Sequence, residues 1–110
     1  MVASLYPHGY DHSVDFTIRQ TETFAAWHRG LRDLKARIAI ARRIDRAATG
    51  NLGDAKAVGE GVSEMRVDVG AGYRVYFVLR NRVMVVLLCG GDKQSQAADI
   101  KLAKRLAKEH

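Results

Sequence analysis

The residues Gly72–Lys93 read GYRVYFVLRNRVMVVLLCGGDK, and this stretch decides the fold class. Apolar and polar side chains alternate over residues 73–80, a pattern typical of a half-buried strand. A turn at Asn81-Arg82 leads into the apolar run Val83–Cys89, which predicts a strand in the interior of a sheet, and Gly90-Gly91 is expected to end that strand. The stretch therefore predicts an antiparallel hairpin at the centre of a sheet.

The strands on either side of this hairpin are expected from the same two-residue period. The segment Val62–Val69 alternates and joins the hairpin through Gly70–Gly72. A short segment, Ala55–Val58, leads into it through a glycine-rich turn. Near the start of the chain, Val14–Gln20 also alternates and predicts a half-buried first strand.

Helices are expected between the first strand and the sheet, and again at the C-terminus. Thr21 is placed to cap a first helix that breaks or bends at Gly30, and Asp33 to cap a second. Asp92 or Ser95 can cap the C-terminal helix. The apolar stripe of the second helix is expected at Leu34, Ile38, Ala41, Ile44 and Ala48. The order of elements predicts an α+β fold, with a strand and a helix hairpin packed on a curved antiparallel sheet and a helix at the C-terminus.

Composition restricts the class of protein. With 110 residues, 47% of them apolar, the chain predicts one domain over residues 14–110, preceded by a poorly ordered leader over residues 1–13. The single cysteine, Cys89, excludes an internal disulfide, and no cysteine or histidine pattern indicates a metal site or any cofactor. No apolar run is long enough for a bilayer, so a cytoplasmic location without a membrane partner is expected. The net charge of +6 favours a polyanion as partner.

The two faces of the hairpin strands suggest a binding site. Counting alternate residues places Glu64, Arg66, Arg74 and Tyr76 together on the face that the first two helices leave uncovered. Guanidinium groups bind phosphate through paired, charge-assisted hydrogen bonds, and a tyrosine ring can stack on an unpaired base. The alternative is a solvated sheet face whose charges pair across strands.

The second predicted helix carries more basic than acidic residues. Arg42, Arg43 and Arg46 are expected to contact RNA through their charges. For any one of them the alternative is an ordinary solvated position.

Several motifs occur in one order along the chain, namely Phe24-x-x-Trp27, Leu31–Asp33, Gly50–Lys56, Glu64–Arg66, Gly72–Phe77, and Leu87–Gln96 followed by Asp99-Ile100. Together they resemble the addiction module killer branch of the RelE/ParE toxin superfamily, close to HigB-like toxins, over about Val14–Ala107. The resemblance implies a RelE-like, microbial RNase-like fold. It also implies the toxin of a type II toxin-antitoxin system, inhibited by a cognate helix-turn-helix antitoxin.

The activity that the resemblance implies is that of an mRNA interferase. Such an endoribonuclease acts on mRNA at the ribosome without a metal, and the ribose 2′-hydroxyl attacks the scissile phosphate. The resemblance also leads us to expect a homodimer, or a heterotetramer with the antitoxin.

Site residues follow from the resemblance by position. Arg74 matches the arginine that stabilises the scissile phosphate, and Arg66 a neighbouring basic position. Lys56 matches a residue that assists deprotonation of the 2′-hydroxyl or neutralises phosphate charge, and Lys93 a basic residue near the leaving group. Glu64 and Gln96 are expected to orient the arginine or the lysine.

One feature departs from the family. The C-terminal segment Lys93–His110 has no aromatic residue, so the usual general acid or base is missing there unless Tyr76, Lys56 or Glu64 supplies it. Two other functions therefore stay open: a ParE-like inhibitor of DNA gyrase, and a non-toxic member that only binds the antitoxin.

Overall fold

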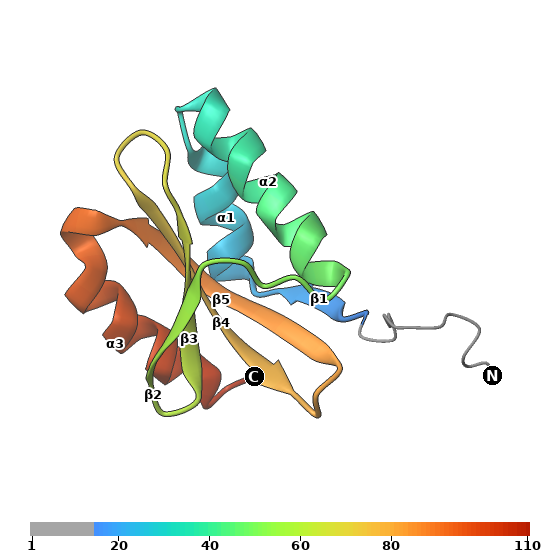
Figure 1. Cartoon of the computed structure of the whole chain (residues 1–110). Helices are drawn as coiled ribbons and strands as arrows, with labels where there is room; N and C mark the ends of the chain where they lie inside the picture. Colours follow the sequence, from blue (N-terminus) through green and yellow to red (C-terminus); the bar gives the residue numbers. More distant parts are fainter. Residues whose placement is uncertain (1–14) are drawn as a thin grey trace, which may run out of the picture.

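A computed structural model describes residues 15–110 of the chain. Its elements, shown in Figure 1, are β1 (Thr17–Gln20), α1 (Glu22–Gly30), α2 (Leu34–Ala48), β2 (Ala55–Gly59), β3 (Val62–Val67), β4 (Tyr73–Arg80), β5 (Met84–Asp92), the short 3₁₀ helix η1 (Lys93–Ser95) and α3 (Gln96–Ala107). Val14 and the predicted leader lie outside the described residues. Within residues 15–110, no helix is both long and apolar enough to cross a bilayer.

The strands form one five-stranded sheet in the order β1-β5-β4-β3-β2. The pair β1 and β5 is parallel, and the other neighbours are antiparallel. The helices α1 and α2 cover one face of the sheet, and α3 packs on the opposite face (Figure 1). The predicted α+β architecture is confirmed, including the interior position of β5 between β1 and β4.

Each face of the sheet has its own hydrophobic core. Under α1 and α2 the core includes Phe24, Ile40 and Phe77. Under α3 it includes Tyr76 and Leu88. The prediction that the second face is uncovered is therefore wrong over most of its length, because α3 folds back across it.

The strand β5 runs past the glycine pair that was expected to end it. Gly90 and Gly91 pair with β4, and the strand ends at Asp92. A Cβ atom on Gly90 would lie 2.2 Å from the ring of Trp27 in α1, and one on Gly91 would lie 1.8 Å from Asp99 Oδ2 in α3. The two glycines therefore let a helix approach the strand from each side, and they continue the strand instead of terminating it.

The predicted caps are confirmed. The Thr21 hydroxyl accepts a hydrogen bond from the backbone N–H of Phe24 at 3.0 Å, and the Asp33 carboxylate accepts one from Ala36 at 3.1 Å. Of the two residues expected to cap the C-terminal helix, Asp92 caps η1, which leads directly into α3, and Ser95 at the start of α3 makes no side-chain capping hydrogen bond.

The predicted apolar face of α2 is only partly correct. Ile44 is buried as predicted, but Leu34 and Ile38 are exposed, and the other buried apolar positions are Ala36, Ile40 and Ala47. The helix is rotated relative to the prediction, so that its buried side also includes a charged residue, Arg43.

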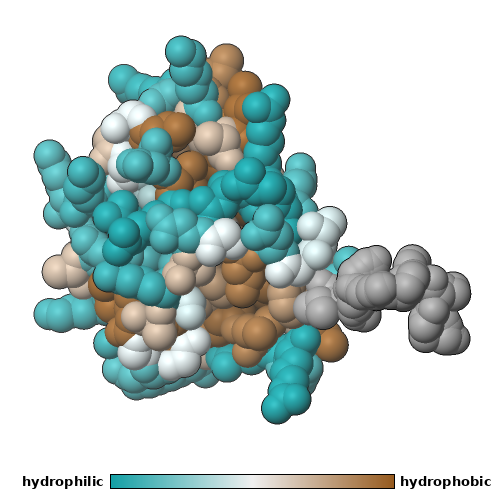
Figure 2. Space-filling model, viewed as in Figure 1, coloured by the Kyte–Doolittle hydropathy of each residue, from teal (hydrophilic) through white to brown (hydrophobic). Residues whose placement is uncertain are grey.

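Figure 2 shows hydrophilic side chains gathered in a band across the middle of this view of the molecule, with hydrophobic ones below it.

Candidate functional site

A cleft of about 210 Å³ opens at one end of the sheet. It is lined by three cations, Arg66, Arg74 and Lys93, and by two carboxylates, Asp54 and Asp68. Three of the four residues expected to act on the phosphate therefore meet in one place, although they come from β3, β4 and the start of η1.

Strand pairing sets the position of the two arginines. Arg66 in β3 and Arg74 in β4 are directly opposite each other in the register. Residues that are opposite in an antiparallel pair point to the same face of the sheet, with Cβ atoms about 5 Å apart. Two guanidinium groups are thereby held side by side, although like charges opposite each other are unfavourable without compensation.

Lys93 reaches the cleft across a glycine. Gly72 has φ +80°, and a Cβ atom there would lie 2.9 Å from Lys93 Cε and 3.9 Å from Arg74 Nη1. A side chain at Gly72 would be strained by its backbone conformation and would displace the lysine. The glycine therefore lets the Lys93 stem approach Arg74.

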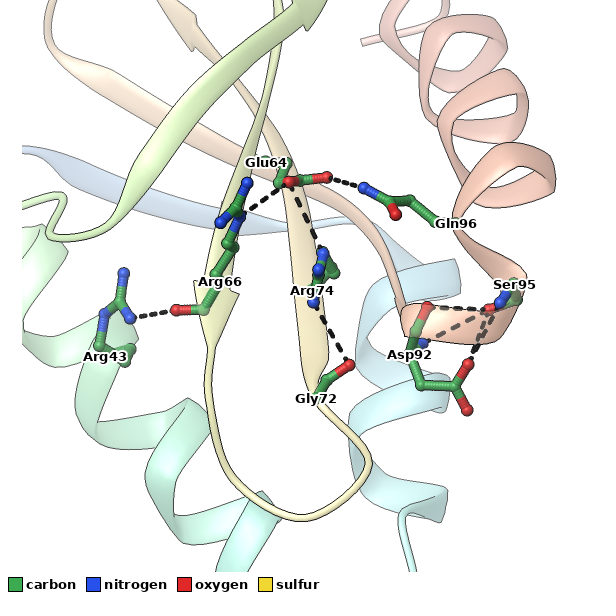
Figure 3. Close-up of polar contacts among 8 residues, drawn as sticks. All are labelled: Arg43, Glu64, Arg66, Gly72, Arg74, Asp92, Ser95 and Gln96. Carbon is green, nitrogen blue, oxygen red and sulfur yellow. Dashed lines mark hydrogen bonds and ion pairs between the residues drawn. The ribbon is translucent and has the colours of Figure 1, made fainter.

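A buried carboxylate compensates the paired arginines. Glu64 has an exposed fraction of 0%, and its Oε2 lies 3.2 Å from Arg66 Nε and 3.6 Å from Arg74 Nε (Figure 3). Its other oxygen, Oε1, accepts a hydrogen bond of 2.8 Å from Gln96 Nε2, in the first turn of α3. Glu64 contacts the Nε side of each arginine, Arg74 Nη1 donates a hydrogen bond of 3.4 Å to the backbone carbonyl of Gly72, and both guanidinium groups line the cleft.

Tyr76 does not contribute to the cleft surface. It is opposite Glu64 in the register but has an exposed fraction of 0%, and its hydroxyl is buried beneath α3. Burial raises the pKa of the Tyr76 hydroxyl well above its usual value, and the Glu64 carboxylate raises it further. The prediction that this ring stacks on a base is wrong, and neither Tyr76 nor Glu64 lines the cleft.

Arg43 is not an exposed RNA contact. It is 9% exposed and donates hydrogen bonds to the backbone carbonyls of Arg66 and Leu52. Burial lowers the pKa of Arg43, the charge of Arg46 lowers it further, and the Asp54 carboxylate partly offsets both effects. The prediction that Arg43 presents its charge to RNA is wrong, because its guanidinium joins the segment before β2 to strand β3.

The remaining predicted residues lie on the surface outside the cleft. Arg42 and Arg46 are exposed on α2. Lys56 is exposed in β2, opposite Glu64 in the register, and does not line the cleft. Their roles stay predictions.

The two carboxylates in the cleft were not predicted as site residues. A bulge between Ala57 and Gly59 shifts the register of β2 against β3 by one residue. Counting from the hairpin turn without the bulge would place Ala55 opposite Arg66. Instead, the backbone carbonyl of Asp54 accepts a hydrogen bond of 2.9 Å from Arg66 N. The sequence Val58-Gly59-Glu60-Gly61 is the signal for this bulge, since glycines often accompany such irregularities.

In chemical terms the cleft combines anion-binding groups with groups that accept hydrogen bonds. Two arginines and a lysine suit a phosphate group. Over residues 15–110, no three His, Cys, Asp or Glu side chains come together in a way that could hold a metal ion.

Solved structures with the same fold include a toxin and a chain of a toxin-antitoxin complex. The structure of a mutant of the E. coli toxin RelE in the free state matches with a TM-score of 0.66 and 15% sequence identity, covering 83% of this chain and 97% of RelE. A chain of the toxin-antitoxin complex RelBE2 from Mycobacterium tuberculosis matches with a TM-score of 0.59 and 20% identity, covering 73% of this chain and all of that chain. The predicted RelE-like fold is thereby confirmed.

Sequence comparison gives the family. An uncharacterized protein of Haemophilus influenzae is 51% identical over 92 residues, which cover 84% of this chain and 93% of that protein. The family model described as Phage derived protein Gp49-like (DUF891) matches residues 30–109. The match does not single out the HigB-like branch, which stays a prediction. The chain belongs to the Phage derived protein Gp49-like family.

Proposed function

We propose that this protein is the toxin of a type II toxin-antitoxin system and acts as a metal-independent endoribonuclease on mRNA at the ribosome. The single observation that carries the proposal is the pair Arg66 and Arg74, held side by side over the buried Glu64 carboxylate and joined by Lys93 in one cleft. This arrangement suits one phosphate group of an RNA chain. The likeness of the fold to RelE, and to a chain of a toxin-antitoxin complex, supports the proposal.

The proposed reaction uses the RNA's own ribose as nucleophile. The 2′-hydroxyl loses its proton and attacks the adjacent phosphorus, the bond from phosphorus to the 5′-oxygen breaks, and the departing oxygen takes up a proton. The products are a 2′,3′-cyclic phosphate and a 5′-hydroxyl. Negative charge grows on the phosphoryl oxygens in the transition state, and preorganised arginines stabilise that charge more than they stabilise the starting phosphate.

Arg74 is the arginine best placed for this role. Its side chain is only 13% exposed, whereas that of Arg66 is 38% exposed. A charge held in a partly dehydrated site interacts more strongly with phosphate than one in open water. Lys93 adds a third cation and is the candidate proton donor to the departing oxygen.

The partners follow from the same proposal. A cognate antitoxin of the helix-turn-helix class would keep the toxin inactive, and the ribosome would hold mRNA in register with the cleft. The exposed Arg42 and Arg46 on α2 are candidates for contact with ribosomal RNA. The protein would act in the cytoplasm, where its substrate is.

The test is cleavage of cellular mRNA after induced expression, mapped by primer extension. We expect wild-type protein to give cuts in phase with codons and to arrest growth. Arg74→Ala should abolish both while keeping the far-UV circular dichroism of the wild type. Arg19→Ala provides the matched control, because Arg19 is an exposed arginine on the edge strand β1.

Two other outcomes would replace the proposal. Intact mRNA together with inhibited DNA supercoiling would indicate a gyrase inhibitor on the same fold. Intact mRNA without growth arrest, in a protein that still binds its antitoxin, would indicate the non-toxic alternative.

A further inference from the structure

The sequence offered Tyr76, Lys56 and Glu64 as possible general acids or bases. Tyr76 and Glu64 are buried and Lys56 does not line the cleft, but the cleft contains other side chains that can supply a base. Asp54 and Asp68 line it together with the three cations. Within residues 15–110, neither carboxylate accepts a hydrogen bond, and no lysine or arginine nitrogen lies within 4.0 Å of either. Two acceptors are thus open to a ligand in a cleft whose cations suit a phosphate.

The order of the strands separates these groups across the sheet. Asp54 immediately precedes β2, Arg66 lies in β3, Arg74 in β4, and Lys93 immediately follows β5. The sheet order β5-β4-β3-β2 therefore gives the sequence lysine, arginine, arginine, aspartate. Arg74 is opposite Gly91, two residues before Lys93, and Arg66 N donates to Asp54 O, so the lysine lies on the β5 side of the arginine pair and the aspartate on the β2 side. Both side chains line the cleft together with the two arginines.

This layout matches the needs of in-line cleavage. The attacking 2′-oxygen and the departing 5′-oxygen lie on opposite sides of the phosphorus, so the group that removes a proton and the group that gives one must also lie on opposite sides. We propose that Asp54 is the general base that takes the 2′-hydroxyl proton, with Lys93 giving a proton to the 5′-oxygen. The inference rests on the proposed nuclease function and names a further catalytic residue for it.

Asp68 is less suitable for this role. It follows β3 next to the turn that contains Gly72, and the Lys93 stem packs on Gly72. A base at Asp68 would stand on the same side of the arginine pair as the proton donor. The Asp54 position is the one opposite Lys93.

The segment that carries Asp54 is firmly held. The backbone carbonyl of Asp54 accepts a hydrogen bond from Arg66 N. The buried Arg43 guanidinium donates to the backbone carbonyl of Arg66 in β3 and to that of Leu52, two residues before Asp54. The Asn51 side chain accepts a hydrogen bond of 3.0 Å from Gly53 N. A catalytic base needs a fixed position, and these contacts fix the backbone beside the arginine pair.

The balance of the step is complete. The Asp54 carboxylate takes one proton as the 2′-oxygen forms its bond to phosphorus. The Lys93 ammonium gives one proton as the bond from phosphorus to the 5′-oxygen breaks. No oxidant, reductant or second substrate is needed, and water later returns both groups to their starting protonation states.

Single-turnover cleavage of mRNA on programmed ribosomes tests the assignment. General base catalysis contributes about 100-fold or more to a rate, so Asp54→Asn should lower the cleavage rate at least that much at saturating toxin. Asp54→Glu should restore part of the rate. Asp45→Asn is the matched control, because it removes one exposed aspartate on α2 and changes the net charge equally; it should cleave within about twofold of the wild type.

A substrate with sulfur in place of the 5′-bridging oxygen separates the two roles. A thiolate leaves without a proton, so this substrate should restore the rate of Lys93→Ala and leave the Asp54→Asn defect unchanged. Restoration of both variants, or an unchanged rate in Asp54→Asn with the ordinary substrate, would overturn the assignment. Loss of activity in Asp68→Asn with none in Asp54→Asn would move the base to Asp68. If wild-type protein itself fails to cleave, the proposed function fails instead.

Discussion

Replacing Glu64 by alanine should destabilise the protein more than any exposed charge change would. The carboxylate is fully buried and contacts Arg66, Arg74 and Gln96 at 3.2, 3.6 and 2.8 Å. Breaking a buried ion pair by removing one partner costs about 3–5 kcal/mol, because the other charge is left uncompensated. Water can reach Arg66, which is 38% exposed, but hardly Arg74, which is 13% exposed. We therefore expect a loss near the lower end, about 3 kcal/mol.

The assay is thermal unfolding followed by circular dichroism, with urea unfolding for the free energy. At about 4 °C for each kcal/mol, Glu64→Ala should lower Tm by about 12 °C. Glu64→Gln keeps the size and one hydrogen-bond acceptor, so its loss should be smaller. The control is Glu22→Ala, which breaks an ion pair with Arg29 whose side chains are 67% and 83% exposed and should cost less than about 0.5 kcal/mol. A Glu64→Ala protein as stable as the control would refute the view that this carboxylate holds the arginine pair.

Further substitutions test other parts of the structure. Gly90→Ala should cost about 1–3 kcal/mol in urea unfolding, because its Cβ would lie 2.2 Å from the Trp27 ring, whereas Gly30→Ala meets nothing within 4 Å and should be neutral or slightly stabilising. Arg43→Ala should lower Tm and Arg42→Ala should not, since only the first donates to backbone carbonyls inside the fold; equal Tm values would restore Arg43 as a surface residue. Burial and the nearby Asp99 charge raise the pKa of the Cys89 thiol to about 12 from 9.0, so iodoacetamide at pH 8 should modify it only after denaturation. Because the buried thiol must stay neutral, stability is retained below pH 9 and falls as the pH rises from 9 toward 12, which urea titrations at pH 8 and 10 can measure.

Local chemistry was enough to predict the elements. Thr21, Asp33 and Asp92 lie just before the first turn of a helix. A short polar side chain at that position accepts hydrogen bonds from the first backbone N–H groups of the helix. The alternation of apolar and polar residues predicted that Glu64, Arg66, Arg74 and Tyr76 share one face of the sheet. The pairing of β3 with β4 confirms this, since Glu64 is opposite Tyr76 and Arg66 is opposite Arg74. These predictions succeeded because each depends only on residues close together in the chain.

Tertiary packing decided what the sequence could not. Whether a sheet face is covered depends on how α3 returns across it, and that return buries Tyr76 and Glu64. Arg43 turns inward and donates to backbone carbonyls 9 and 23 residues away in the sequence, contacts that helical periodicity does not predict. Asp54 reaches the cleft only through the bulge in β2, which alternation alone does not reveal.

The cleft is formally neutral, and for the proposed nuclease this separates recognition of RNA from its cleavage. Arg66, Arg74 and Lys93 are balanced by Glu64, Asp54 and Asp68, so the net charge of +6 resides elsewhere on the chain. Long-range attraction toward RNA is then a property of surfaces such as α2, and it weakens as salt screens exposed charges. In the proposed reaction, bond breaking relies on short-range contacts inside the cleft, which salt affects much less. Under the proposed function, ionic strength should therefore govern how often the protein finds the ribosome, and hardly how fast it cuts once bound.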